Sequence, residues 1–478
     1  MTRGESQESE VTGLASDFEP FETKMRAEGL PDVAIRAFRR AYGLLRSGAK
    51  LLVGEADIRP VEAVPSLDDL SAFHARGLEA LSATALVKLN GGLGTSMGLD
   101  GPKSLIEVRP GLTFLDVVAR QTETLARKRG VRVPMVLMNS FRTDGESLAR
   151  LASYPGLSGG IRPSFLQHKV PKVDARTLGP ASFPTDSDLE WCPPGHGDLY
   201  AAIVTSGVLD ELVAAGIRWL FVSNVDNLGA SLDPSILGYL ASESIPFLME
   251  VTDRTAADRK GGHLAELPGG RLTLREIAQT PSDELESFQD IQRHRYFNTN
   301  NLWLDLNALR ALLTAHDGIV PLPVIRNEKT VDPTDASSAP VIQLETAMGA
   351  AIESFDGARA VRVPRSRFAA VKTCADLVVV GSDAYLVDDD YHLVPNPARS
   401  GPSPLVDLDS RYYKLYREFR ERFPGGMPSL IACDRLSVRG DVRFGAGVAI
   451  EGSVSVVNER PEPGSVPAGT RLAGEVRV

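Results

Sequence analysis

The sequence predicts an α/β protein with a largely parallel sheet, followed by a separate β domain at its C-terminal end. Between residues 81 and 385, short apolar runs alternate with helical patterns, which is typical of strand–helix–strand units. From Leu436 onward, apolar residues alternate with polar residues and glycines, as in short strands joined by tight turns. Ligands of such sheets bind beyond the carboxyl ends of the strands, so residues that follow each apolar run are site candidates.

The individual elements follow from apolar periodicity. Helical spacing predicts two helices between Phe21 and Leu45 with a break at 29–31, and further helices over 114–127 and about 200–215. Apolar runs predict strands over 85–89, 133–138, 219–222 and 246–251. The last 43 residues fit either coils of a parallel β-helix or a small β-sandwich.

These elements define the expected domain organisation. We expect a flexible tail over 1–18, an N-terminal helical segment over 19–80, a catalytic core over 81–385, a helical linker over 386–435 and a C-terminal β domain over 436–478. An open strand edge in that last domain would allow a homo-oligomer, although charges such as Glu475 and Arg477 would oppose edge pairing.

Composition restricts the class of protein. The 478 residues carry a formal net charge of -10, which argues against nucleic acid as the partner but allows a local pocket for an anionic ligand. Three scattered cysteines form neither a disulfide framework nor a metal cluster. The acidic N-terminus is unlike a secretory signal, and no apolar run reaches the ~18 residues of a membrane span. We therefore expect a cytoplasmic protein without a membrane partner.

A glycine-rich loop is the strongest functional signal. It follows the predicted strand and reads Leu89-Asn90-Gly91-Gly92-Leu93-Gly94-Thr95-Ser96-Met97-Gly98, ending in Gly101-Pro102-Lys103-Ser104. Glycines let backbone N–H groups approach phosphates, and Lys103 adds a positive charge. The dinucleotide fingerprint fails because Gly98 comes one position late, and Pro102 interrupts the P-loop pattern. A tight turn with an incidental lysine is the alternative.

Two further motifs supply candidate ligand groups. The string Trp191-Cys192-Pro193-Pro194-Gly195-His196-Gly197-Asp198 predicts a rigid loop presenting Gly195 and His196, or else a proline-rich surface turn. After the strand ending at Val222, alternation would place Asn224 and Asp226 on one face. A carboxylate there suits Mg²⁺, and a helix N-cap is its alternative.

The last two motifs are weaker. The amides of Phe297-Asn298-Thr299-Asn300-Asn301-Leu302-Trp303 suit sugar hydroxyls but also suit turns. Three cations, Arg365, Arg367 and Lys372, lie in an otherwise apolar stretch over 363–373 and indicate either a second phosphate clamp or a solvated face.

Together these strings resemble the eukaryotic-type UTP–glucose-1-phosphate uridylyltransferase family. The resemblance runs from about residue 80, in family order, and includes Ile342-Gln343-Leu344-Glu345-Thr346-Ala347-Met348-Gly349 and the Gly440-Asp441-Val442 repeats. It implies a nucleotide-diphospho-sugar transferase core, similar to a Rossmann fold, with a small left-handed β-helix behind it. Two departures affect loop stiffness: Ala370 where the family usually has proline, and Cys192 where an aromatic residue is common.

The resemblance implies roles for individual residues. The groups implied to bind UTP are Leu89, Asn90, Gly91, Gly92, Lys103, Gln167, Gly195, Asp226 and Lys372. Those implied to hold glucose 1-phosphate are His196, Asn224 and Asn300, and Asp226 would hold Mg²⁺ as the cofactor. Lys103 and Lys372 would be the catalytic cations.

The expected reaction is an in-line attack of glucose 1-phosphate on the α-phosphorus of UTP, giving UDP-glucose and pyrophosphate. The attacking oxygen is already anionic, so catalysis depends on positioning and charge neutralisation. A uridylyltransferase for galactose or N-acetylhexosamine 1-phosphate, and a non-catalytic nucleotide-sugar sensor, are the alternatives. A sensor would have lost the carboxylate or the lysines, and all are present.

Overall fold

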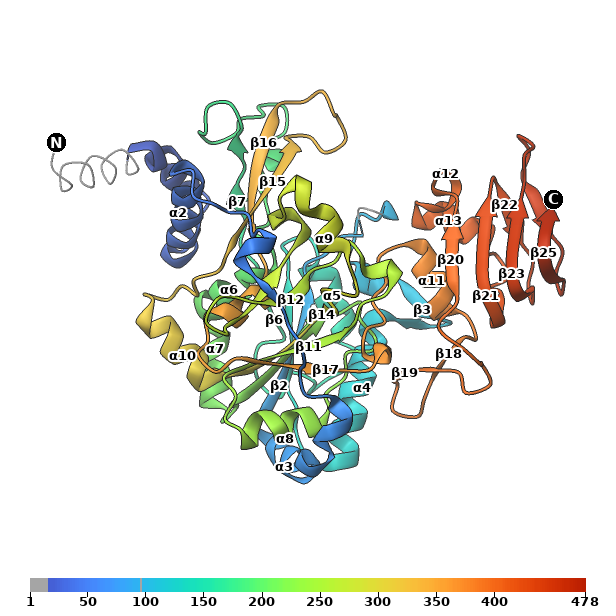
Figure 1. The fold of residues 1–478 in the computed structure, drawn as a ribbon, viewed down its shortest axis with the longest axis horizontal. Helices are drawn as coiled ribbons and strands as arrows, with labels where there is room; N and C mark the ends of the chain where they lie inside the picture. Colours follow the sequence, from blue (N-terminus) through green and yellow to red (C-terminus); the bar gives the residue numbers. More distant parts are fainter. Residues whose placement is uncertain (1–15, 95–96) are drawn as a thin grey trace. The chain divides into compact units, whose positions relative to one another are not determined.

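The computed structural model describes residues 16–94 and 97–478 (Figure 1). The chain forms two compact units. Unit 1 comprises Met1–Val87, Phe165–Val222 and Asp233–Val363, and unit 2 comprises Lys88–Ser164, Ser223–Leu232 and Pro364–Val478. Strands β2 (Thr84–Asn90) and β10 (Trp219–Asn224) each contribute residues to both units. Strands β2 and β10 confirm the strands expected over 85–89 and 219–222.

Unit 1 is built on a mixed sheet. Besides β10, its strands are β1 (Arg59–Pro60), β11 (Phe247–Asp253), β12 (His263–Glu266), β13 (Leu272–Arg275), β14 (Tyr296–Asp305) and β17 (Arg359–Arg362). The long strand β14 runs antiparallel to β10, β11 and β12, whereas β11 and β17 are parallel. The α/β class is confirmed. Antiparallel pairs come from β14, whose apolar run does not reveal its direction, and from β12, which also pairs antiparallel with β1 and β13.

Unit 1 also contains α-helices. They are α2 (Asp32–Arg46), α3 (His74–Ala80), α6 (Leu199–Thr205), α7 (Val208–Ala214), α8 (Pro234–Ser242), α9 (Leu285–Gln289) and α10 (Leu306–Ala315). The single helix expected over 200–215 is wrong, because Gly207 at φ 79° separates α6 from α7. Helices α3 and α8 pack closely (Figure 1), since a Cβ on Gly77 would lie 1.6 Å from the Pro234 carbonyl oxygen.

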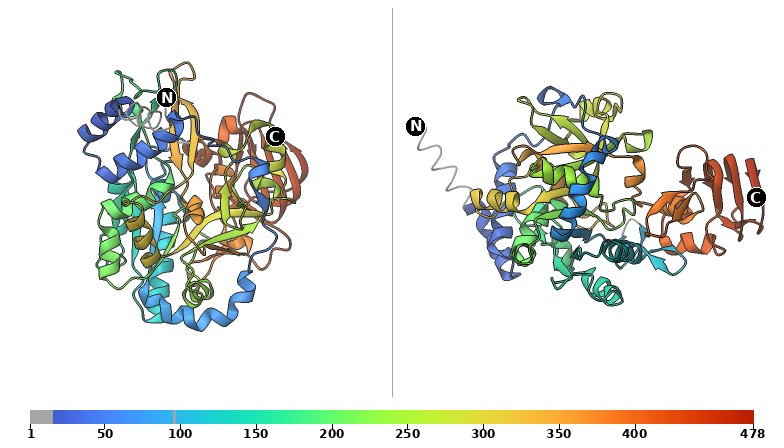
Figure 2. Two further views of the ribbon diagram at one scale, coloured as in Figure 1. Left: turned by 60° about the vertical axis from the view of Figure 1, so that its left-hand side comes forward. Right: turned by 90° about the horizontal axis from the view of Figure 1, so that it is seen from below.

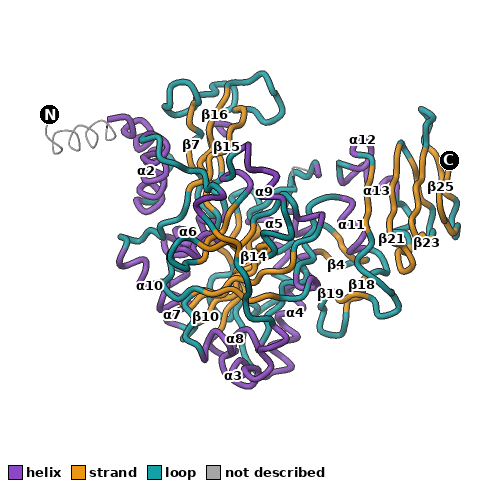
Figure 3. Tube along the Cα trace, in the orientation of Figure 1, coloured by secondary structure: helices purple, strands orange, loops and turns teal. Residues whose placement is uncertain are grey.

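The N-terminal helices of unit 1 pack against two small sheets. Residues 16–27 are helical and, with α2, bury Phe18, Phe21 and Tyr42. One sheet pairs β8 (Val173–Asp174), β16 (Pro340–Thr346) and β15 (Val324–Thr330), and the other pairs β7 (Val170–Pro171) with β9 (Trp191–Cys192). Figure 3 labels β7, β15 and β16. Residues 1–15 of the expected tail lie outside the described residues. The last three residues of the expected tail, 16–18, belong to the helix over 16–27, where Phe18 is fully buried.

Unit 2 begins at the carboxyl ends of β2 and β10. Its core elements are β5 (Met135–Asn139), α4 (Phe114–Arg129), α5 (Asp144–Leu151), β3 (Glu107–Arg109), β4 (Leu112–Thr113) and α11 (Cys374–Gly381), and β6 (Ser164–Leu166) lies at its boundary with unit 1. The buried carboxylate of Asp116 caps α4 at Thr113 and accepts two 2.6 Å hydrogen bonds from Arg150 of α5. This ion pair fixes α5 against α4. Burial by itself would raise the pKa of the Asp116 carboxyl group, but the hydrogen bonds from Arg150, Thr113 and Tyr154 outweigh burial and lower the pKa to about 2.

The C-terminal part of unit 2 is a coil of parallel strands (Figure 2). Strands β20 (Leu405–Leu408), β21 (Ser429–Arg439), β23 (Ala449–Val457) and β25 (Arg471–Arg477) pair in parallel, as do β22 (Val442–Phe444) and β24 (Gly464–Val466). Strands that alternate between two parallel sheets form a β-helix, so the sandwich alternative is wrong.

The boundary of this domain differs from the one expected. Strand β20 begins at Leu405 and already belongs to the sheet of β21. The expected helical linker over 386–435 holds the helices α12 (Ser410–Tyr413) and α13 (Tyr416–Arg422), but also β19 (Leu393–Pro395), β20, the start of β21 and most of β18 (Tyr385–Val387). No helix of the described residues is long and apolar enough to cross a membrane.

Candidate active site

The glycine loop leaves β2 with its backbone open. Gly92 is exposed, and a Cβ added to it would meet no atom within 4 Å. Gly94 is more crowded, because a Cβ there would lie 2.4 Å from Leu99 Cδ1 and would require that side chain to move. Thr95 and Ser96 lie outside the described residues. The space around Gly92 would let a ligand approach the backbone closely, as an anion site requires.

The side chain of Asn90 points into unit 2. It is 2% exposed and donates 2.7 Å hydrogen bonds to Asn139 Oδ1 and Ser147 Oγ. Its amide therefore ties the end of β2 to β5 and α5. Any contact of Asn90 with a ligand falls to its backbone.

Lys103 links three segments of unit 2. It opens a short 3₁₀ helix, η5 (Lys103–Leu105), and its backbone N–H bonds the Gly92 carbonyl at 3.3 Å. Its ammonium pairs with the Asp226 carboxylate and donates to the Val371 carbonyl. The structure thereby brings together the glycine loop, Asp226 and the residue before Lys372, which the sequence places more than a hundred positions apart.

Asp226 lies in the turn that follows β10. The strand ends at Asn224, so the turn and not strand alternation sets the direction of the carboxylate. The N-cap alternative is wrong, because the next helix, α8, is capped by Asp233. Both Asp226 and Asn224 are half-buried.

Buried polar groups hold this turn in place. Lys88 of β2, only 2% exposed, donates to Ser223 Oγ at 2.6 Å and to the Ala230 carbonyl at 2.9 Å. Arg367 is also buried and donates to the Ser231 carbonyl at 2.7 Å. Its guanidinium therefore supports the loop, and the solvated-face alternative is wrong for Arg367.

Lys372 is exposed at the start of α11. Its backbone N–H donates to Asp376 at 2.8 Å, while its side chain lines a cavity of about 500 Å³ together with Met97 and Lys414. That volume lies within the range of small-molecule sites. The cavity, the glycine loop and Asp226 all belong to unit 2.

In unit 1, Gly195 adopts a conformation that favours glycine. Its φ is 79° and its ψ is 171°, and a Cβ there would lie 2.4 Å from the Thr346 carbonyl oxygen. The Thr346 N–H bonds the Pro194 carbonyl at 2.9 Å. The segment is therefore packed against β16 and is not the free surface turn of the alternative reading.

His196 follows in a fixed tautomer. The Met348 backbone N–H donates to His196 Nδ1 at 2.9 Å, so Nδ1 carries the lone pair and Nε2 carries the proton. Burial lowers the pKa of His196 to about 4, which keeps the ring neutral at pH 7. The ring can thus donate one hydrogen bond through Nε2, for example to a phosphate oxygen.

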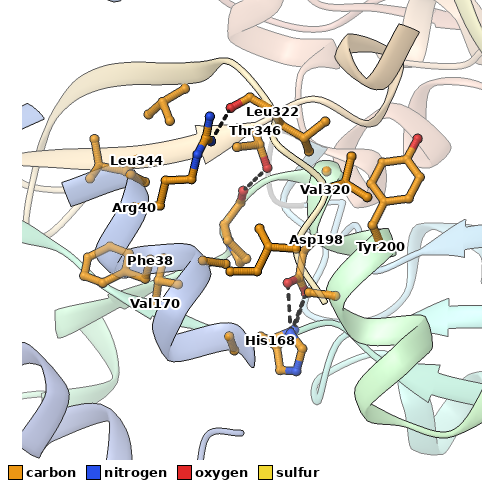
Figure 4. A pocket seen from close by; sticks show the side chains of 18 residues that line it. Phe38, Arg40, His168, Val170, Asp198, Tyr200, Val320, Leu322, Leu344 and Thr346 are labelled. Carbon is orange, nitrogen blue, oxygen red and sulfur yellow. Dashed lines mark hydrogen bonds and ion pairs between the residues drawn. The ribbon is translucent and has the colours of Figure 1, made fainter. Parts of the chain in front are cut away.

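Gln167 is connected to the turn that contains His196 and Asp198 through its neighbour, His168. The His168 N–H donates to Asp198 Oδ2 at 2.6 Å, and His168 Nδ1 lies 2.9 Å from Asp198 Oδ1 (Figure 4). Gln167 itself is half-buried. The pocket drawn in Figure 4 has a volume of only about 70 Å³, which is too small for a nucleotide.

Asn300 lies in a bulge of β14. Its φ is 58°, and its N–H and side-chain oxygen both bond the side chain of Asn298, at 2.9 and 2.8 Å. Gly349, which follows Met348, packs against the same asparagine, since a Cβ on Gly349 would lie 3.1 Å from Asn298 Nδ2. His196 and Asn300 are therefore joined through the segment that begins at Met348.

Comparison with known families identifies the kind of protein to which these site residues belong. The sequence model of the UTP–glucose-1-phosphate uridylyltransferase family matches residues 36–451 of this chain. The chain belongs to the UTP–glucose-1-phosphate uridylyltransferase family. The enzyme of that name from Saccharomyces cerevisiae is 44% identical over 83% of this chain and 78% of its own. The one from Solanum tuberosum is 42% identical over 86% and 84%.

Solved structures agree with this uridylyltransferase assignment. A variant UDP-glucose pyrophosphorylase from Leishmania major, in complex with UDP-glucose, has a TM-score of 0.90 and 42% identity, covering 97% of this chain and 99% of that one. The similarity therefore extends over both units.

The uridylyltransferase residues predicted from the sequence fall into two sets. Gln167, Gly195, His196 and Asn300 belong to unit 1, and the remaining predicted residues, Leu89, Asn90, Gly91, Gly92, Lys103, Asn224, Asp226 and Lys372, belong to unit 2. The Gly262 carbonyl accepts the N–H of Asn298, and a Cβ on Gly262 would lie 2.5 Å from the Glu276 carboxylate. Glu276 is therefore a neighbour of this segment that the sequence did not single out.

Proposed function

We propose that the protein transfers the uridylyl group of UTP to glucose 1-phosphate, forming UDP-glucose and releasing pyrophosphate. Family membership over 36–451 carries this conclusion. The site supports it, because Lys103, Asp226 and Lys372, which a mere sensor would have lost, are all retained around one loop system of unit 2.

The roles of the unit 2 residues follow from their charges. The open backbone at Leu89, Gly91 and Gly92 would receive UTP phosphates. Lys103, paired with Asp226 in this structure, would neutralise the departing pyrophosphate, and the exposed Lys372 would neutralise the attacking and α-phosphoryl oxygens. No general base is needed, because the attacking phosphate oxygen is already an anion.

Unit 1 supplies neutral hydrogen-bonding groups. The Nε2–H of His196 would donate to the phosphate of glucose 1-phosphate without adding charge, and Asn300 would bond its sugar hydroxyls, with Asn224 of unit 2 as a further contact. Gln167 and the backbone of Gly195 would bind the uracil ring. Substrate discrimination would thus rest mainly on amides and backbone groups, which reject a misplaced hydroxyl strongly when desolvated.

Magnesium fits as the cofactor. Asp226 offers one half-buried carboxylate beside Lys103, and Mg²⁺ typically takes one or two carboxylates plus phosphate oxygens and water. The described residues hold no cluster of three or more His, Cys, Asp or Glu side chains, so a dedicated protein cage for a metal is not part of this proposal. When bound, Mg²⁺ would offset phosphate charge.

The test is pyrophosphate release from UTP and Mg²⁺ with glucose 1-phosphate, compared with galactose 1-phosphate and N-acetylglucosamine 1-phosphate. Release with glucose 1-phosphate well above the other two supports the reaction and its substrate. Release only with another sugar phosphate would refute glucose 1-phosphate as the substrate. No release with any of the three would refute the proposed uridylyltransferase activity. The cytoplasm is the proposed location, supported by three free, buried cysteine thiols.

A further inference from the structure

Asn300 holds a left-handed backbone conformation, which asparagine tolerates better than most other non-glycine residues. Its φ of 58° lies in the left-handed region, which costs a non-glycine residue about 1 kcal/mol or more. The register between β11 and β14 shifts at this point, between Glu250 and Val251. Such a bulge redirects a side chain only if neighbouring groups hold it in place.

Glu250 of β11 contacts both residues that flank Asn300. Its backbone carbonyl accepts the Thr299 hydroxyl at 2.7 Å, and its Oε2 accepts Asn301 Nδ2 at 3.0 Å. Its Oε1 accepts Trp303 Nε1 at 2.9 Å. Glu250 is 0% exposed, so these hydrogen bonds form away from water, where bonds to a charged acceptor are strongest.

We propose that Glu250 is a positioning residue for glucose 1-phosphate: it fixes Thr299 and Asn301 so that Asn300 faces the sugar. This inference rests on the proposed function, because it needs Asn300 to contact the sugar. Glu250 is fully buried and does not reach a ligand itself. All the groups involved belong to unit 1, whereas the lysines of the phosphate site belong to unit 2.

A change in the KM for glucose 1-phosphate, without a change in the KM for UTP, therefore distinguishes this role from a general loss of structure. In the variant E250Q, the amide NH₂ takes the place of one carboxylate oxygen and meets the NH₂ of Asn301, so one buried donor loses its acceptor. We expect the KM for glucose 1-phosphate to rise about tenfold, the effect of one hydrogen bond to a charged group. The KM for UTP should stay within about twofold, because the bulge is not part of the UTP site.

A second variant reverses the hydrogen-bond polarity. In E250Q/N301D the new amide donates to the new carboxylate, Trp303 keeps its acceptor, and the net charge of the pair is unchanged. We expect the KM for glucose 1-phosphate to return to within about threefold of the wild-type value. Such a recovery would show that the hydrogen bond between positions 250 and 301 sets the KM for glucose 1-phosphate, whereas a merely structural defect would raise both KM values in E250Q.

Two controls keep the test decisive. The variant D116N alters another buried carboxylate, in unit 2, and should lower stability without a selective change in KM for glucose 1-phosphate. The variant W303F removes one donor to Glu250 and should raise the same KM by about threefold even where E250Q is too unstable to assay.

An unchanged KM for glucose 1-phosphate in E250Q and W303F, an equal rise in both KM values, or no recovery in E250Q/N301D would overturn the role of Glu250. Wild-type turnover is measured in the same series. Absence of wild-type turnover counts against the proposed function, whereas active E250Q with wild-type KM values counts against this inference alone.

Discussion

Replacing Gly195 with alanine separates two contributions to the geometry of the His196 loop. The first is conformational: φ 79° with ψ 171° is a region that only glycine adopts readily, and an alanine there costs about 1–3 kcal/mol. The second is steric. The new Cβ would lie 2.4 Å from the Thr346 carbonyl oxygen and 2.9 Å from its nitrogen, so the loop must move away from β16.

That movement breaks specific hydrogen bonds. The Thr346 N–H to Pro194 carbonyl bond and the Met348 N–H to His196 Nδ1 bond, both 2.9 Å, are each worth about 0.5–1.5 kcal/mol. Together with the strain, we expect Gly195→Ala to lower the free energy of unfolding by about 2–6 kcal/mol. Because His196 loses the contact that fixes its tautomer, kcat/KM should fall by about 10²-fold, the scale of one displaced site group.

Gly216 offers the matched control. It belongs to the same unit and has φ 80°, but a Cβ there would meet no atom within 4 Å. Gly216→Ala should therefore carry only the conformational cost and leave kcat/KM unchanged. The assay is urea unfolding together with steady-state pyrophosphate release for both variants. Equal losses of stability, with normal kcat/KM in Gly195→Ala, would refute the reasoning.

Three further outcomes are expected. Lys372→Ala should lower turnover by about 10²–10³-fold at unchanged stability, and near-normal turnover would remove Lys372 from the site. His196→Asn keeps an acceptor for the Met348 N–H but loses the Nε2 donor, so it should fold like wild type and raise the KM for glucose 1-phosphate about tenfold; an unchanged KM would contradict the donor role. Asp116, with a pKa near 2 against 3.8 unfolded, contributes about 2 kcal/mol above pH 4 that is lost as pH falls through 2. Asp116→Asn should therefore flatten the dependence of unfolding free energy on pH between about 4 and 2 in urea titrations, and an unchanged slope would show that folding does not lower the pKa of Asp116.

Local sequence signals predicted the elements that carry the candidate phosphate-binding groups. A strand followed by glycines and Lys103 is readable because the alternation of apolar residues and the lack of Cβ atoms are properties of neighbouring residues. The split of α6 from α7 was not predicted, because the apolar spacing continues across Gly207 and does not report its positive φ. The domain boundary at Leu405 was missed, because β20 is a four-residue strand whose membership shows only in its pairing with β21.

The supporting residues of the site were invisible to sequence reasoning. Lys88 looks like any charged residue in a strand, yet it is buried and joins Ser223 to Ala230. Glu250 lies in an apolar run that predicts only a strand, and its partners on β14 are about fifty positions away. Arg367 fits a phosphate clamp or a solvated face by its sequence, and the structure shows it buried and bonded to the Ser231 carbonyl. Burial and long-range hydrogen bonds decide these roles, and neither is encoded in local spacing.

The sequence by itself determined the α/β class, the order of the motifs and the chemical type of each candidate group, because periodicity, glycine content and charge act over a few residues. Only the tertiary structure decided that Lys103 meets both Asp226 and the carbonyl before Lys372, that His196 carries its proton on Nε2, and that Asn300 is held at a bulge. These facts depend on contacts between residues far apart in the chain, whose free energy exists only once the folded backbone has brought them together.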